Sequence, residues 1–237
     1  MIHRLAARES HFSDRLYAME RYRDDLLAIG PDRPPAPRWN QDWFPRLDAA
    51  MGYTQVRDRR PRRIVEVGCG HSTRFFCRAV ADGGLATEVT AIDPEPRATL
   101  AGLPGLRLID RPVQEVGTEP FAALAAGDIL SIDSSHKTAQ GGDVDFLMTM
   151  VLPMLPVGAA VHFHDMFMPD DYPESWAWRG YDEAAAVEAM IAGGGWSIDF
   201  ASHYAVSRMA DAVAASVVGA LPLVEGAIES SLWLEHD

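Results

Sequence analysis

The sequence predicts an α/β fold built on a doubly wound, largely parallel sheet. Apolar strand segments alternate with helical segments from residue 62 onward. Within this pattern, the apolar run at 64–67 is followed by the glycine turn Gly68-Cys69-Gly70 and then by a helix over 72–82. A strand, a glycine turn and a helix N-terminus form the unit that holds a nucleotide in open α/β sheets. The sequence therefore predicts a nucleotide-binding domain.

Residues 1–61 precede this domain, and we expect them to form a helical extension to the domain at 62–237. Apolar residues recur at roughly helical spacing over 1–30, and a short helix is expected around 45–52. The extension has no strand signal, so it could be a lid over the nucleotide site or simply extra packing. A lid would also include the loop at 166–180, and the aromatic residues offered by both segments are Tyr17, Tyr22, Trp39, Trp43, Tyr172, Trp176 and Trp178.

The remaining elements follow in order from apolar runs and turn residues. Strands are expected at 64–68, 88–92, 106–110, 128–132, 159–163, 196–206 and 231–235. Helices are expected at 72–82, after Pro94 and Pro96, and at 118–126, 143–155, 181–192 and 209–220.

Composition limits the kind of partner. The formal net charge of −13 argues against nucleic acid and against an anionic membrane surface, because either would need a basic face. Cys69 and Cys77 lack zinc spacing, and reduced thiols are expected. Charged residues throughout the first thirty positions argue against a signal peptide, and the apolar runs are shorter than a membrane span. We expect a cytoplasmic protein that acts on a small molecule, with a homodimer left open.

Acidic residues gather where the predicted strands end. Ligands of open α/β sheets bind beyond the carboxyl ends of the strands, and a buried carboxylate there needs a ligand, a cation or water. We assign Asp110 to solvent. The acids with an expected role are Glu66, Asp93, Asp133 and Asp165, the last preceded by His164.

The glycine turn distinguishes two cofactors. A dinucleotide fingerprint needs a third glycine where this chain has Thr73. The acid in Glu66-Val67-Gly68-Cys69-Gly70 instead resembles motif I of class I S-adenosylmethionine-dependent methyltransferases. In that family the acid helps to hold the methionine end of the cofactor.

Further stretches resemble a bacterial branch of these enzymes, the methyltransferase-24-like family. They are 72–74, 132–137, 142–144, 152–158, 161–167, 171–173 and 230–234. The resemblance implies a Rossmann-like seven-stranded sheet whose last strand is antiparallel. It also implies that the methionine moiety lies among Glu66, Gly68, Cys69, Gly70 and Ser72, the ribose beside Asp93, the adenine near Val113, and the sulfonium beside Asp133.

The reaction needs in-line approach to an activated methyl group and removal of a proton. His136 and His164 are the candidate bases, with Asp133 and Asp165 as the other candidate catalytic residues, and His162 is assigned to packing. Asp133, His164 and Asp165 could instead hold a divalent ion, with Mn²⁺, Fe²⁺ or Zn²⁺ favoured over Mg²⁺. We assign no metal to the site, and both the metal-free base and the divalent-ion site stay open as interpretations.

The function predicted first is S-adenosylmethionine-dependent methyl transfer to a small-molecule hydroxyl or amine. Non-methylation chemistry on the same cofactor is the main alternative. A nicotinamide-dependent oxidoreductase is disfavoured by Thr73 and by the lack of a Tyr-x-x-x-Lys motif, and a non-catalytic cofactor sensor would not need histidines at the strand ends.

Overall fold

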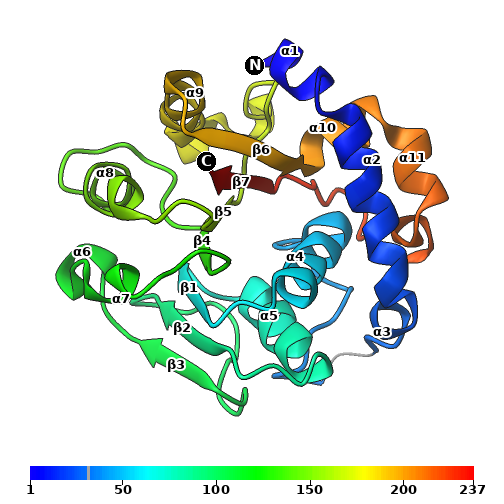
Figure 1. The fold of residues 1–237 in the computed structure, drawn as a ribbon, viewed down its shortest axis with the longest axis horizontal. Coiled ribbons are helices and arrows are strands. Elements are labelled where there is room, and N and C mark those ends of the chain that lie inside the picture. The colour runs from blue at the N-terminus through cyan, green and yellow to red at the C-terminus, as the bar shows by residue number, and fades with distance from the viewer. Residues whose placement is uncertain (31–32) are drawn as a thin grey trace.

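The computed structural model describes residues 1–30 and 33–237. Its centre is one sheet of seven strands in the order β3-β2-β1-β4-β5-β7-β6 (Figure 1). The strands are β1 (Arg63–Val67), β2 (Glu88–Ile92), β3 (Leu106–Ile109), β4 (Ile129–Ile132), β5 (Ala160–Phe163), β6 (Trp196–Ala201) and β7 (Leu232–His236).

The five strands β1 to β5 are parallel, whereas β7 runs antiparallel to both β5 and β6. This confirms the predicted seven-stranded sheet with an antiparallel last strand. The chain order reverses between β1 and β4, which are hydrogen-bonded neighbours. A crevice forms at such a switch point, because the loops after the two strands leave in opposite directions.

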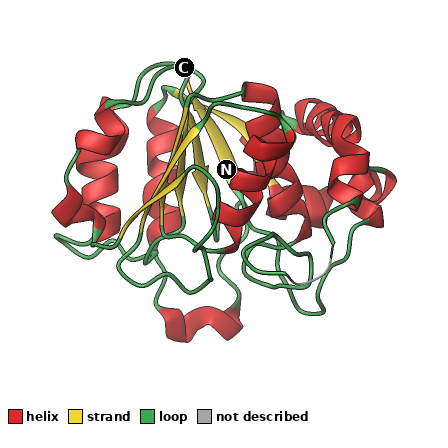
Figure 2. Cartoon of the chain, turned by 90° about the horizontal axis from the view of Figure 1, so that it is seen from below, coloured by secondary structure: helices red, strands yellow, loops and turns green. Residues whose placement is uncertain are grey.

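Helices cover both faces of the sheet (Figure 2). Figure 1 shows α4 (Arg46–Arg59) and α5 (His71–Asp82) on one face. The other face carries α6 (Val113–Val116), α7 (Glu119–Ala122), α8 (Asp143–Phe146) and α9 (Glu183–Gly193). The strands β4 and β5 are buried along their whole length, as expected for parallel strands covered on both sides.

The N-terminal extension begins with α1 (Ile2–Ala6), α2 (Glu9–Ala18), η1 (Met19–Tyr22) and α3 (Arg23–Leu27). It lies beside β6 and α4, next to α10 (Ser202–Arg208) and α11 (Ala210–Ala215) (Figure 1). Its apolar stripe is buried in the main core, and Phe12 packs edge-on against Phe200 of β6 at 5.4 Å between ring centroids. Residues 1–30 therefore share the core of the sheet domain.

A buried carboxylate fixes this extension to the sheet. Asp199 of β6 accepts hydrogen bonds from the Arg15 guanidinium at 2.5 and 3.0 Å, and from Gln55 Nε2 of α4 at 2.5 Å. His11 Nε2 lies 3.0 Å from the same carboxylate. Three segments far apart in sequence thus meet at one side chain.

Several predicted elements have different bounds. The helix expected at 45–52 extends to Arg59, and the one expected over 1–30 is divided into four segments. The strand expected at 196–206 ends at Ala201 and α10 follows, because Ser202 and Ala205 are buried three residues apart, on one face of a helix. The segment after Pro94 is a loop, in which the Glu95 backbone N–H donates to the Asp93 carboxylate at 2.8 Å.

The helix expected over 143–155 changes its hydrogen-bond pattern along its length. It begins as α8, continues as a π-helix, η2 (Leu147–Val151), and ends as a 3₁₀ turn, η3 (Leu152–Met154). Pro153 has no N–H to continue an α-helical ladder, which accounts for the change at this end. The remaining short elements are η4 (Glu174–Arg179) and η5 (Val217–Ala220). Among the described residues, every helix falls short of the length or apolar character that a bilayer span requires.

Candidate active site

A cavity of about 1070 Å³ opens at the carboxyl edge of the parallel strands. Its walls come from the loops that follow β1, β2, β4 and β5, as expected at the switch point. The segments 42–44, 112–114 and 226–228, together with Trp176, Arg179 and Tyr181, complete the walls. Small-molecule pockets typically measure about 300–1,000 Å³, so this cavity has room for a cofactor and a second small molecule.

The two glycines of the turn after β1 have different roles. Gly68 has φ of +77°, and a Cβ at this position would lie 1.7 Å from the Asp133 carbonyl oxygen. Only glycine fits there, because the backbones after β1 and β4 touch. A Cβ at Gly70 would meet no atom within 4 Å. Gly70 therefore leaves open space on the cavity wall, into which a ligand can approach the backbone.

Glu66 is buried and does not line the cavity. Its carboxylate accepts hydrogen bonds from the hydroxyls of Ser72 and Thr73, each at 2.5 Å, and Thr73 Oγ1 accepts from the Gly70 N–H at 2.9 Å. Burial raises the pKa of Glu66 to about 8. Glu66 thus holds the turn and the start of α5 in place. It does not face the cavity, so it would influence a bound cofactor only by fixing the position of the turn.

Asp93 follows β2 and lies on the cavity wall. One of its oxygens accepts from the Cys69 N–H and the other from the Glu95 N–H, both at 2.8 Å. The two bonds fix the carboxylate, and each oxygen keeps a lone pair for a further donor. Cys69 is a free thiol whose pKa is raised by burial, so it borders the cavity as a neutral group. Val113 lies on the wall at the end of the loop after β3.

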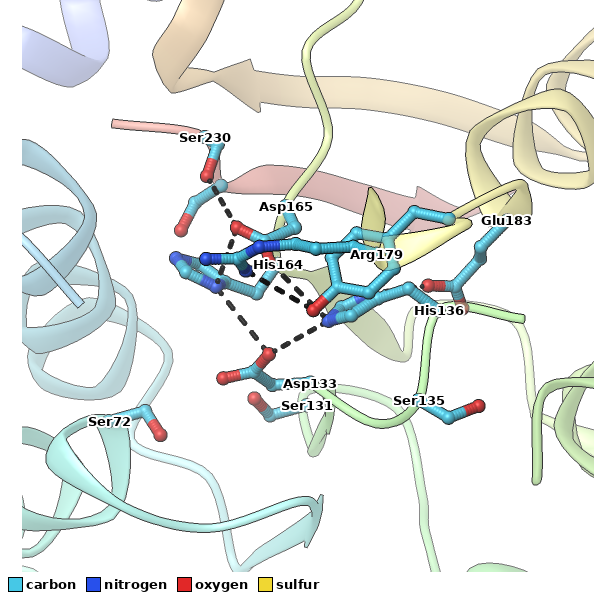
Figure 3. Close-up of polar contacts among 12 residues, drawn as sticks. Ser72, Ser131, Asp133, Ser135, His136, His164, Asp165, Arg179, Glu183 and Ser230 are labelled. Atoms are coloured by element: carbon cyan, nitrogen blue, oxygen red, sulfur yellow. Dashed lines mark hydrogen bonds and ion pairs between the residues drawn. The ribbon is translucent and has the colours of Figure 1, made fainter. Parts of the chain in front are cut away.

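Four residues from the loops after β4 and β5 converge on one part of the cavity wall (Figure 3). We call Asp133, His136, His164 and Asp165 the strand-end cluster. Asp133 Oδ1 lies 3.2 Å from His136 Nε2 and 3.5 Å from His164 Nδ1. The Asp165 carboxylate lies 3.6 Å from His136 Nε2 and 3.5 Å from His164 Nδ1. Each histidine therefore directs one nitrogen at the same two carboxylates.

A buried carboxylate stands behind each histidine. Glu183 Oε2 of α9 lies 2.9 Å from His136 Nδ1, and Asp48 Oδ2 of α4 lies 3.3 Å from His164 Nε2. The Asp48 carboxylate also accepts from the backbone N–H groups of Ser230 and Ser231, each at 2.9 Å. These contacts hold both rings by the nitrogen that faces away from the cluster.

The carboxylates determine the protonation of both histidines. Burial alone would lower the pKa of His136, but Asp133 and Glu183 outweigh it and raise that pKa to about 10. Burial opposes protonation of His164 as well, yet Asp133 and Asp165 raise its pKa well above the usual value. In this state both rings carry protons at neutral pH, and neither can accept another.

Two members of the cluster have an unusual backbone. His136 has φ of +58° and Asp165 has φ of +54°, in the left-handed region that residues other than glycine seldom adopt. Such strain is found at functional sites, where the surrounding structure maintains it. His162, by contrast, lies between the hydroxyls of Ser131 and Ser231 at 2.9 Å each, and burial lowers its pKa to about 3. It is a neutral packing residue.

The aromatic residues of the expected lid lie in three places: on the cavity wall, on the protein surface and in the core. Trp43 and Trp176 line the cavity. Tyr17 and Trp178 are about 80% exposed, whereas Trp39 is buried against Phe75. None of the described residues 1–30 reaches the cavity wall. The segments that border the opening are therefore 42–44 and 176–181 rather than the N-terminal helices.

Comparison with known proteins addresses the family. Residues 65–166 match a family model described as a methyltransferase domain. This stretch runs from β1 to the end of the strand-end cluster, and it includes the glycine turn. Over residues 65–166 the chain is therefore similar to a methyltransferase domain.

Solved structures resemble this chain in fold. The structure "cmcI-D160 Mg-SAM" is 17% identical, with a TM-score of 0.50, over 90% of this chain and 84% of that chain. The branched-chain polyamine synthase of Thermus thermophilus is 15% identical, with a TM-score of 0.50, over 92% of this chain and 64% of that chain. The methyltransferase PaMTH1 of Podospora anserina is 15% identical, with a TM-score of 0.48, over 98% of this chain and 95% of that chain.

A curated relative is the uncharacterized protein y4gI of Sinorhizobium fredii, which is 29% identical over 158 residues. The match covers 60% of this chain and 17% of that protein. The chain thus spans about a sixth of the length of the curated relative it matches.

Most of the site residues predicted from the sequence lie around one cavity. Gly68, Cys69, Gly70, Ser72, Asp93, Val113 and the strand-end cluster all border it. The sequence analysis missed Asp48 and Glu183. Asp48 lies in a predicted helix among apolar residues. An acidic residue within such an apolar run was the feature of the sequence that could have predicted its burial.

Proposed function

We propose that this chain is an S-adenosylmethionine-dependent methyltransferase acting on a hydroxyl or amine of a small molecule. The observation that carries the proposal is a single cavity lined both by the glycine turn and Asp93 and by the strand-end cluster. A cofactor bound along the first part would direct its methyl group at an acceptor beside the second. Such an arrangement favours group transfer by positioning.

The cofactor contacts proposed from this geometry divide into three. Asp93 would accept hydrogen bonds from the ribose hydroxyls, because its oxygens are fixed on the cavity wall. The turn at 68–70 would meet the methionine moiety, with Gly70 allowing close approach of the backbone. The loop with Val113 would border the adenine.

The strand-end cluster would act on the acceptor. The N–H groups of the two protonated imidazoles would donate hydrogen bonds to the acceptor oxygen as it loses its proton, and Asp133 would take that proton and pass it to the solvent. The side chain of Asp133 is about a third exposed, so its carboxylate is open to an incoming ligand. It can accept a hydrogen bond from the acceptor and orient it toward the methyl group.

The cluster also suits a divalent metal ion. One ligand atom each from Asp133, His136 and Asp165 lies within 4.8 Å of the others. His136 Nδ1 is held by the buried Glu183, the arrangement that commonly supports a histidine ligand from behind. We propose these three residues as ligands, with His136 Nε2 losing its proton when the ion binds, so that His136 takes the place that the sequence analysis gave to His164. An imidazole in the set favours Mn²⁺, Fe²⁺ or Zn²⁺ over Mg²⁺. A bound ion would supply a positive charge that acidifies the acceptor.

Calorimetric titration with S-adenosylhomocysteine tests the cofactor. We expect binding to the wild type, no binding of NAD, and affinity reduced more than about tenfold in Asp93→Ala, the order of a lost pair of charge-assisted hydrogen bonds. Asp110→Ala is the matched control, because Asp110 follows the neighbouring strand β3 and is exposed. Binding of NAD alone, or equal affinities in the two variants, would contradict the proposal.

A second use of the same cofactor deserves a separate assay. The Thermus thermophilus structure of similar fold is named as a synthase in complex with 5′-methylthioadenosine, and a fold of this type is thus not confined to methyl transfer. Mass spectrometry of the product distinguishes the two chemistries. Methyl transfer releases S-adenosylhomocysteine, whereas transfer of the aminocarboxypropyl group or of its decarboxylated form releases 5′-methylthioadenosine.

A further inference from the structure

The 3₁₀ helix η4 and the residues just after it form the cavity wall beside the strand-end cluster. It contributes Trp176, Arg179 and Tyr181. The Arg179 guanidinium carbon lies 3.8 Å from the centroid of the Trp176 ring and 5.5 Å from that of Tyr181. The aromatic faces hold the planar cation in one position at the cavity wall.

The hydrogen-bonding capacity of Arg179 is largely unused. Its Nη1 donates to the Tyr181 hydroxyl at 3.3 Å and lies 4.0 Å from Asp165 Oδ2. Its Nε is buried without a hydrogen-bond partner among the described residues. A guanidinium has five N–H donors, and a buried donor without an acceptor is costly.

Other partly buried arginines of this chain are paired differently. Arg46 places Nε and Nη2 on the Glu229 carboxylate at 2.9 and 3.0 Å, and Arg15 places the same two atoms on Asp199. In both cases the fork of the guanidinium faces a carboxylate. Arg179 has the same fork beside a cavity, and its contact with Asp165 is long.

We propose that the acceptor is a small aromatic carboxylic acid whose carboxylate binds Arg179. This inference rests on the proposed methyl transfer and names the class of its acceptor. A carboxylate in the cavity matches the planar shape of the guanidinium, whose contact with Asp165 is long. The rings of Trp176 and Tyr181 suit a flat aromatic body.

The distances also limit the size of the acceptor. Arg179 lies 4.0 Å from Asp165, a member of the strand-end cluster, and Figure 3 shows its side chain extending across that cluster. The carboxylate and the reacting hydroxyl or amine must therefore lie within one small molecule. A hydroxy- or amino-substituted benzoic acid meets this requirement.

The test compares acids with their methyl esters. Salicylate, 4-hydroxybenzoate, 3,4-dihydroxybenzoate and 2-aminobenzoate, each beside its methyl ester, are titrated into the wild type saturated with S-adenosylhomocysteine. A charge-assisted hydrogen-bond pair predicts at least one acid that binds about ten- to a hundredfold more tightly than its ester. In Arg179→Gln the acid and the ester should bind equally, and Arg179→Lys should keep part of the difference.

Arg208→Gln is the control, because this arginine pairs with Asp170 on the surface and does not line the cavity. It should retain the full preference for the acid. The inference is wrong if no acid in the panel binds more tightly than its ester, or if Arg179→Gln keeps the preference. Unchanged affinity of Arg179→Gln for S-adenosylhomocysteine verifies that the variant is folded. A wild type that fails to bind S-adenosylhomocysteine contradicts the proposed function itself, so the two failures are distinguishable.

Discussion

Replacing Glu66 by glutamine should change how the stability of this protein depends on pH. The carboxyl is buried beneath the glycine turn, and its hydrogen-bond partners, Ser72 and Thr73, are neutral. Burial therefore raises its pKa from 4.5 to about 8. A glutamine amide has nearly the shape of the neutral carboxyl and, like it, combines a donor group with an acceptor oxygen, but it never ionises.

The sign follows from proton binding. Below pH 4.5 Glu66 is protonated in both the folded and the unfolded chain, and its contribution to stability is complete. As the pH rises, the unfolded chain ionises first, so the free energy of unfolding falls until the pH passes about 8. The gap between the two pKa values corresponds to roughly 5 kcal/mol over the whole range, of which about 3 kcal/mol is lost by pH 7.

Urea unfolding of the wild type and Glu66→Gln between pH 5 and 9 measures this effect. The variant should gain stability relative to the wild type as the pH rises to 8, and the difference should then stay constant. Glu119→Gln removes a carboxyl from an exposed position and should follow the wild type throughout. Parallel pH curves for the wild type and Glu66→Gln would refute the explanation.

Two further predictions concern the N-terminal extension and the metal ligands. Burial tends to raise the pKa of Asp199, but Arg15 outweighs it and holds that pKa below its ordinary value, so Asp199→Asn should lose about 3 kcal/mol at neutral pH. That loss should shrink as the pH falls through the native pKa, with unchanged affinity for S-adenosylhomocysteine, and a pH-independent loss would count against the ion pair. Co²⁺ should give a visible absorption spectrum with the wild type that is lost in His136→Ala and Asp165→Asn, whereas its survival in both would exclude the proposed ligand set.

The sequence was sufficient for the sheet and for the edge where the site lies. Apolar runs such as the one within 128–132 predicted their strands, because parallel strands covered on both faces are buried along their length. The position of Asp93, Asp133 and Asp165 at strand ends was enough to bring them to one cavity, since the carboxyl ends of parallel strands share an edge. These conclusions depend on the local sequence pattern and on the small number of sheet topologies that an alternation of strands and helices allows.

The partners of the charged groups were decided by the tertiary structure alone. Whether Glu66 would face a ligand or the hydroxyls of α5 depends on how the turn packs, and the sequence pattern is the same in both cases. His164 and Asp48 are 116 residues apart, and Arg15 and Asp199 are 184 apart. Such pairs depend on which helix covers which face, and only the folded core determines that. Periodicity along the chain specifies a buried face, but it does not specify the residue that the face will meet.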